Sequence, residues 1–171
     1  VPAFEEHVLI AVKRHYKMFY FQRGTRHTTY EIALSQNPIG HKVMRGDNRL
    51  PEGAYRIIQK ARGPFGGTYG AYFGPVWIRI DYPNNFDAKT ALQNGLIPRC
   101  DYDRIIEANN SGKWPPKNTN LGGGIGLHGW NGLWDINGNR HLTWGCISMQ
   151  NSDIDSLYSQ IPIGTKIIIL P

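Results

Sequence analysis

Short runs of β-branched and aromatic residues recur along this chain, and glycine or proline interrupts them at close intervals. The 171 residues include 20 glycines and 11 prolines, and both residue types destabilise the interior of a helix. A hydrophobic share of 40% still supplies a core and argues against disorder. We therefore predict a mostly β fold with short helices, of the α+β class, formed by one domain over residues 1–171.

Periodicity and turn residues predict where the strands lie. Residues 7–13 and 17–22 are separated by Arg14-His15-Tyr16, a spacing typical of a hairpin. Residues 37–55 contain proline, glycine, asparagine and aspartate too often for a regular element, so they predict a long surface loop. The other predicted strands are residues 27–34, 55–59, 76–81, 125–128 and 165–170.

Capping residues predict three short helices. Each predicted helix begins at a residue whose side chain can accept a hydrogen bond from the first turn, and ends near glycine or proline. The three are a helix capped by Asn84 or Asn85 that runs through Leu92 and ends at Gly95, a helix capped by Asp101 that runs to about Asn109 with Ile105 and Ile106 inward, and a helix capped by Asn151 or Ser152 that stops at Pro162.

Composition limits the partners and compartments that we expect. The net charge of +6 suits an anionic partner, but the basic residues are dispersed and do not form a nucleic-acid-binding arm. No apolar run reaches the roughly 18 residues that span a bilayer, and residues 1–10 lack the pattern of a signal peptide. We expect a soluble mature or trimmed form that binds no nucleic acid. Without C-x-x-C or H-x-x-x-H spacing, we expect no metal site.

Two further motifs have a plain structural interpretation. Residues 124–129 match a dinucleotide-binding glycine pattern, but loops flank them where that pattern needs a strand and a helix. We interpret these glycines as space for backbone near a cleft. Cys100 is expected to be a packing residue just before a helix, and a disulfide between Cys100 and Cys146 is not expected.

Cys146 is the candidate nucleophile. It follows Gly145 in a glycine-rich context, and a thiol attacks only as its thiolate, so a base must take its proton. His128 ends a predicted strand and could reach Cys146 from another element, whereas His141 lies in the same turn. Residues alone leave three alternatives open: His128 as the base, His141 as the base, or an inert buried cysteine.

The spacing of these residues resembles a known family. His128 is followed by Gly129, fourteen residues separate His128 from Thr143-Trp144-Gly145-Cys146, and Asn151 lies beyond. This pattern resembles the YkuD-type L,D-transpeptidase catalytic domain. Further stretches that are similar to the same family are Asn37-Pro38-Ile39-Gly40, Gly46-Asp47, Leu50-Pro51-Glu52-Gly53-Ala54-Tyr55 and Ile161-Pro162-Ile163-Gly164-Thr165.

The resemblance implies a β-sandwich or mixed sheet with an active cleft at one edge, and action on peptidoglycan. It implies that Cys146 attacks a stem tetrapeptide, releases D-Ala as a thioester forms, and passes the acyl group to an amine acceptor in a 3→3 cross-link. His128 is the implied base, the Gly129 carbonyl orients it, and the N–H groups of Gly145 and Cys146 form the oxyanion site. The implied substrate contacts are Thr143, Trp144, Trp130, His141 and Ser148.

The resemblance also implies a protein that needs no cofactor, works outside the cytoplasmic membrane in the periplasm or cell wall, and is a monomer. Trp144 and Ser148 stand where the family commonly has a histidine and an arginine. These departures keep two alternatives open. The first is an L,D-carboxypeptidase or endopeptidase in which water resolves the thioester, and the second is a catalytically idle wall-binding module.

Overall fold

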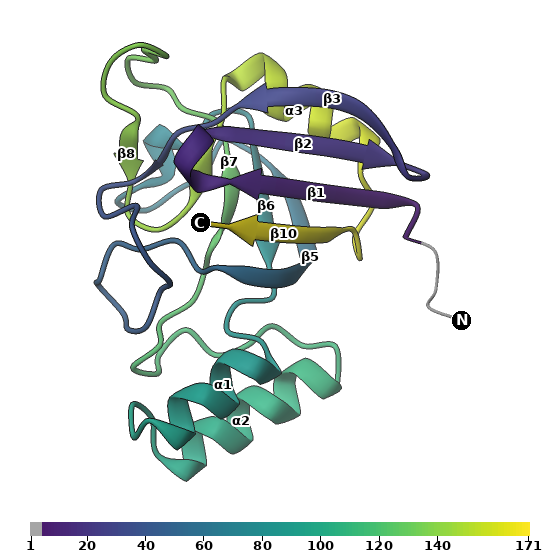
Figure 1. Cartoon of the computed structure of the whole chain (residues 1–171). Helices are drawn as coiled ribbons and strands as arrows, with labels where there is room; N and C mark the ends of the chain where they lie inside the picture. The colour runs from purple at the N-terminus through teal and green to yellow at the C-terminus, as the bar shows by residue number, and fades with distance from the viewer. Residues whose placement is uncertain (1–4) are drawn as a thin grey trace.

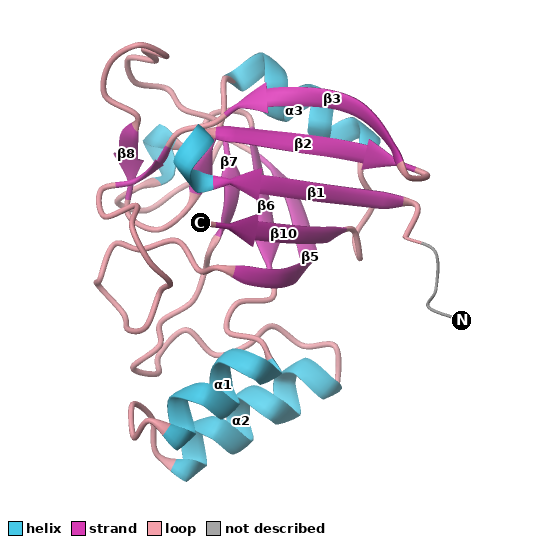
Figure 2. Ribbon diagram, in the orientation of Figure 1, coloured by secondary structure: helices cyan, strands magenta, loops and turns pink. Residues whose placement is uncertain are grey.

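The computed structural model describes residues 5–171 (Figures 1 and 2). In chain order its elements are β1 His7–Val12, η1 Lys13–His15, β2 Lys17–Gln22, β3 Thr25–Glu31, β4 Leu34–Ser35, β5 Gly53–Arg62, η2 Gly70–Tyr72, β6 Val76–Ile80, α1 Asn85–Gln93, α2 Arg99–Asn110, β7 Gly126–His128, β8 His141–Thr143, β9 Ile147–Ser148, α3 Asn151–Gln160 and β10 Lys166–Leu170. The prediction of a mostly β fold with short helices is confirmed.

Within the described residues, eight strands form one mixed sheet in the order β3-β2-β1-β10-β5-β6-β7-β9. β1 pairs with β10 in parallel and β7 pairs with β9 in parallel, while the other neighbours are antiparallel. The sheet curls, so that β6 and β7 lie behind β1 and β2 in the view of Figure 1. The short strands β4 and β8 pair separately, next to the β9 edge.

The main core lies inside this curl. Side chains alternate along a strand, so Leu9 and Ala11 of β1 both point inward and are fully buried. α3 covers the inner surface and contributes Ile154 and Leu157 to the same cluster. The helix therefore fixes the sheet edge where β7 and β9 lie, which is the edge that carries the cysteine.

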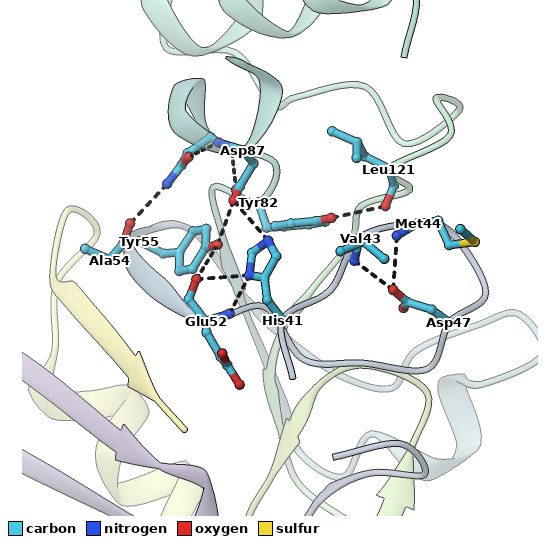
Figure 3. Close-up of polar contacts among 11 residues, drawn as sticks. His41, Val43, Met44, Asp47, Glu52, Ala54, Tyr55, Tyr82, Asp87 and Leu121 are labelled. Atoms are coloured by element: carbon cyan, nitrogen blue, oxygen red, sulfur yellow. Dashed lines mark hydrogen bonds and ion pairs between the residues drawn. The ribbon is translucent and has the colours of Figure 1, made fainter. Parts of the chain in front are cut away.

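The antiparallel pair α1 and α2 lies below the sheet in Figure 1 and has a small core of its own. Buried polar contacts join this pair to the sheet (Figure 3). Asp87 accepts hydrogen bonds from the Asn84 N–H at 2.9 Å and from the Tyr55 hydroxyl at 3.0 Å, and its carboxylate is 3.6 Å from the His41 ring. Burial raises the pKa of Asp87 to about 6, although these donors and His41 oppose the rise.

Several predicted strand boundaries differ from the structure. The third strand is Thr25–Glu31 and does not continue to residue 34, because Leu34 pairs with His141 of β8 instead. β5 begins at Gly53, before the predicted start at Tyr55, because Gly53 pairs with Ile169. The strands β8 and β9 were not predicted, since two or three residues give no readable alternation.

Two predicted helix starts are wrong. α2 begins at Arg99 with Pro98 before it, so Asp101 lies within the first turn and is not the cap. This start also places Cys100 on the exposed surface of α2, not in a packed position before a helix. α3 begins at Asn151, and its preceding residue, Gln150, gives no side-chain cap.

The predicted cap at Asn84 is confirmed, and it forms a reciprocal capping box with Asp87. We expect Asn84→Ala to lower the free energy of unfolding by about 1 kcal/mol, because the Asp87 N–H loses its acceptor. Chemical denaturation measures this. Asn94→Ala removes an exposed amide at the other end of α1, and it should change the same quantity by less than about 0.5 kcal/mol. Equal losses in both variants would contradict the assigned role of the box.

Candidate active site

The pairing of β7 with β9 brings Cys146 and His128 to one cavity. Leu127 lies opposite Ile147 and His128 opposite Ser148, and Cys146 directly precedes β9. Both Cys146 and His128 line the same cavity of about 330 Å³. The two candidate residues therefore line one cavity from adjacent segments.

The turn that presents Cys146 needs glycine at position 145. Gly145 has a φ of 147°, and a Cβ there would lie 3.0 Å from the Ile125 side chain and 3.3 Å from the Arg49 carbonyl. A residue with a side chain would be strained in this conformation and would crowd both neighbours. The Thr143 hydroxyl donates to the Cys146 carbonyl at 2.6 Å and closes the turn. The conformation of this turn thus fixes the position of Cys146.

His128 is buried, and two aromatic rings pack against its imidazole. The Phe73 ring stacks on the imidazole at 4.4 Å between centroids, and Trp77 stacks at 6.0 Å. Nδ1 lies 2.6 Å from the Gly129 carbonyl, which can only accept, so Nδ1 carries the proton and Nε2 is free to accept one. Burial lowers the pKa of His128 to about 4, against the raising effect of the Gly129 carbonyl.

The resting pair is neutral. Burial raises the pKa of the Cys146 thiol to about 11, while the Gly126 N–H and the charges of Lys42 and Arg79 oppose the rise. At neutral pH the sulfur therefore keeps its proton and the imidazole of His128 is uncharged. Both groups are therefore uncharged at neutral pH, and Nε2 of His128 is available as a proton acceptor.

Asn151, which was expected to cap a helix and which also lies in the family pattern, holds the loop after His128 in the structure. Its Oδ1 accepts from the Trp130 N–H at 2.9 Å, and its Nδ2 donates to the Asn131 side chain at 3.0 Å. A Cβ at Gly129 would lie 2.1 Å from the same Oδ1, so the loop after His128 packs directly on this amide. Asn151 fixes the position of the carbonyl that orients the imidazole. Asn151 was expected to accept a hydrogen bond from the first turn of α3, but it accepts one from the Trp130 N–H instead.

Of the five residues expected to contact a substrate, two line the cavity and three do not. Thr143 and Trp144 line the cavity. Trp130 stacks on Tyr72 beside it, and His141 is exposed with its ring bonded to the Tyr16 hydroxyl at 2.6 Å. Ser148 is fully buried, so it is not placed to touch a substrate; its hydroxyl donates to the Gly129 carbonyl at 3.1 Å.

Trp144 belongs to an aromatic wall of the cavity. It packs on Tyr69 at 4.4 Å and on Tyr72 at 5.8 Å between ring centroids. The cavity lining thus combines this apolar wall with polar and basic side chains. Cys100 and Cys146 are both free thiols. Within residues 5–171, no three His, Cys, Asp or Glu side chains lie together as a metal site would require.

The His128 ring gives a direct test of this geometry. We expect its NMR signals to remain those of a neutral ring with the proton on Nδ1 from about pH 8 down to about pH 5, because burial holds its pKa near 4. Assignment uses His128→Gln, which removes the signals. Titration of this ring near pH 6.5, the ordinary value for histidine, would contradict the buried neutral base.

Comparisons with known proteins agree with the fold. A family model described as the L,D-transpeptidase catalytic domain, YkuD, matches residues 5–169. Bd1075 of Bdellovibrio bacteriovorus is 21% identical with a TM-score of 0.63, over 99% of this chain and 49% of that one. The helical cell shape determining protein Pgp2 of Campylobacter jejuni is 17% identical with a TM-score of 0.65, over 98% and 48%.

An L,D-transpeptidase of Enterococcus faecium, solved as a cysteine-to-serine mutant, is 15% identical with a TM-score of 0.59, over 99% of this chain and 51% of that one. The chain thus spans about half the length of these three structures. No curated protein sequence matches it. At these identities the likeness is one of fold, while the family match covers nearly the whole sequence. The chain belongs to the YkuD family of L,D-transpeptidase catalytic domains.

Proposed function

We propose that this protein is a cysteine-dependent L,D-transpeptidase that acts on peptidoglycan stem tetrapeptides. The observation that supports this most directly is the placement of Cys146 and His128 in one cavity, with Nδ1 of the imidazole bonded to the Gly129 carbonyl and Nε2 left to accept a proton. Membership of the YkuD family supplies the class of reaction. The donor is a stem peptide with D-Ala at position four, and the acceptor is an amine of a second stem.

The first half-reaction forms a thioester. Nε2 of His128 takes the thiol proton as Sγ of Cys146 bonds to the carbonyl carbon of the third residue, and the electron pair of that carbonyl moves to oxygen. The backbone N–H groups of Gly145 and Cys146 are assigned to that oxygen. When the tetrahedral intermediate collapses, the C–N bond to D-Ala breaks, and His128 returns the proton to the leaving amine.

The second half-reaction transfers the acyl group. An amine enters the cavity, loses a proton to His128 as it attacks the thioester, and displaces the Cys146 sulfur, which regains the proton. The product is a 3→3 cross-link. None of these steps uses a cofactor. We assign the reaction to the periplasm or cell wall and to a monomer. In residues 5–171, no helix has the length and hydrophobicity to cross a membrane.

The products of a muropeptide assay test this function. We expect purified protein and disaccharide tetrapeptide to give cross-linked dimers and free D-Ala, detected by mass spectrometry. Cys146→Ala should give neither product, because no other side chain in the cavity is a strong nucleophile. Tripeptide without dimers would instead assign a carboxypeptidase in which water resolves the thioester. Unchanged substrate with the wild-type protein, and no carbapenem adduct on Cys146, would indicate an idle wall-binding module.

The neutral resting pair predicts the pH dependence of acylation. His128 is uncharged above its pKa of about 4, so the wild-type rate of acylation by a carbapenem should be nearly flat between about pH 6 and about pH 8. In His128→Gln no base takes the proton, so only the small ionised fraction of Cys146, whose pKa is raised, can react. Its rate should be far lower and should rise roughly tenfold per pH unit. Intact-protein mass spectrometry measures both rates, and parallel profiles would contradict the role of His128.

A further inference from the structure

The cavity beside Cys146 is lined by basic side chains as well as by the aromatic wall. Lys42, Arg45 and Lys117 line it, and no aspartate or glutamate of the described residues does so. Lys42 is nearly fully buried and is already paired with Asp47 at 2.8 Å. Arg45 and Lys117 have no ion pair and no side-chain hydrogen bond to any residue in the range 5–171. Two positive charges therefore face the cavity without a partner.

The loop that carries Arg45 is held in place by one carboxylate. Asp47 accepts hydrogen bonds from the N–H groups of Val43 at 2.8 Å and Met44 at 3.0 Å (Figure 3), and also from Lys42. Burial alone raises the pKa of Asp47, but these donors outweigh it, and the pKa lies below its usual value. The carboxylate therefore stays ionised and keeps the loop folded at neutral pH. Arg45 is presented by a fixed backbone.

A strip of glycines separates the two cations and leads to the nucleophile. The strip is residues 122–124, and all three glycines line the cavity. A Cβ at Gly122 would lie 3.2 Å from the Arg45 side chain, and a Cβ at Gly124 would lie 3.3 Å from the Lys117 side chain. The Cys146 sulfur is 4.0 Å from the Gly124 carbonyl. The glycine strip thus leaves space in the cavity between the Arg45 and Lys117 side chains, and Gly124 lies next to Cys146.

We propose that Arg45 and Lys117 bind a carboxylate of the peptide whose acyl group Cys146 receives, and so select donors in which that carboxylate is free. This inference rests on the proposed function, with meso-diaminopimelate as the third residue of the stem, as the family resemblance implies. Guanidinium and ammonium groups that share one carboxylate form charge-assisted hydrogen bonds, which are stronger than neutral ones. Two carboxylates of such a donor have this chemistry: the terminal carboxylate of the leaving D-Ala and the side-chain carboxylate of the diaminopimelate.

Amidated donors test the proposal and separate the two carboxylates. We expect one of two amides, at the terminal carboxyl or at the side-chain carboxyl of the third residue, to lower kcat/KM about tenfold in the wild type, mainly through KM. The amide that lowers it identifies the bound carboxylate. In the double variant Arg45→Gln, Lys117→Met, the acid and that amide should react at similar rates. Arg45→Lys should retain part of the discrimination, since it keeps the charge.

Lys89→Met is the matched control. It removes the same charge from the exposed surface of α1, outside the cavity, and it should keep the full discrimination between acid and amide. Two results would overturn the proposal: equal rates for the acid and both amides in the wild type, or an undiminished preference for the acid in the double variant. Thermal unfolding of each variant shows that it remains folded.

A protection assay keeps the site testable if no peptide is turned over. N-acetyl-D-alanine should slow alkylation of Cys146 by iodoacetamide in the wild type, while its amide should not, and the double variant should lose the protection. That result would support a carboxylate site even if the proposed function fails. Equal protection by N-acetyl-D-alanine and its amide, or by neither, would overturn a site for the terminal carboxylate independently of the muropeptide assay.

Discussion

The parallel pairing of β7 with β9 is the constraint on which the site depends. Only two residue pairs form this contact, and β9 lies at the edge of the sheet. A segment from much earlier in the chain secures it: Ala33 and Ser148 exchange both backbone hydrogen bonds, and β4 pairs with β8 beside them. Cys146 and His128 thus come to line one cavity because the residues after β3 hold the returning chain against the sheet.

Burial then determines which chemistry the pair can perform. A charged imidazole packed against the Phe73 and Trp77 rings would lose its hydration, so the neutral form is favoured. The thiol loses hydration in the same way. The neighbours of each group oppose this effect without reversing it. The Gly129 carbonyl, held by Ser148 and by the loop that Asn151 anchors, keeps the ring in the productive tautomer.

Features that depend on local sequence could be predicted, and features that depend on tertiary contacts could not. The first hairpin and the Asn84 cap follow from neighbouring residues, and both were predicted correctly. The spacing of His128 and Cys146 pointed to a family that the family match confirms, and the two residues line one cavity, while their catalytic roles remain a proposal. Asn151 was assigned to a helix cap because its partner, the Trp130 N–H, is distant in sequence. The cations of the cavity come from two loops, so no spacing in the sequence links Arg45 to Lys117.

A nucleophile that rests in its protonated form also resists oxidative damage. Peroxides convert a thiolate to sulfenic acid far more readily than they attack a neutral thiol. The pKa of the Cys146 thiol lies above its ordinary value, so the sulfur keeps its proton at neutral pH, and it forms no disulfide with Cys100. The desolvation that raises this pKa therefore also lowers the rate at which peroxides would oxidise the sulfur.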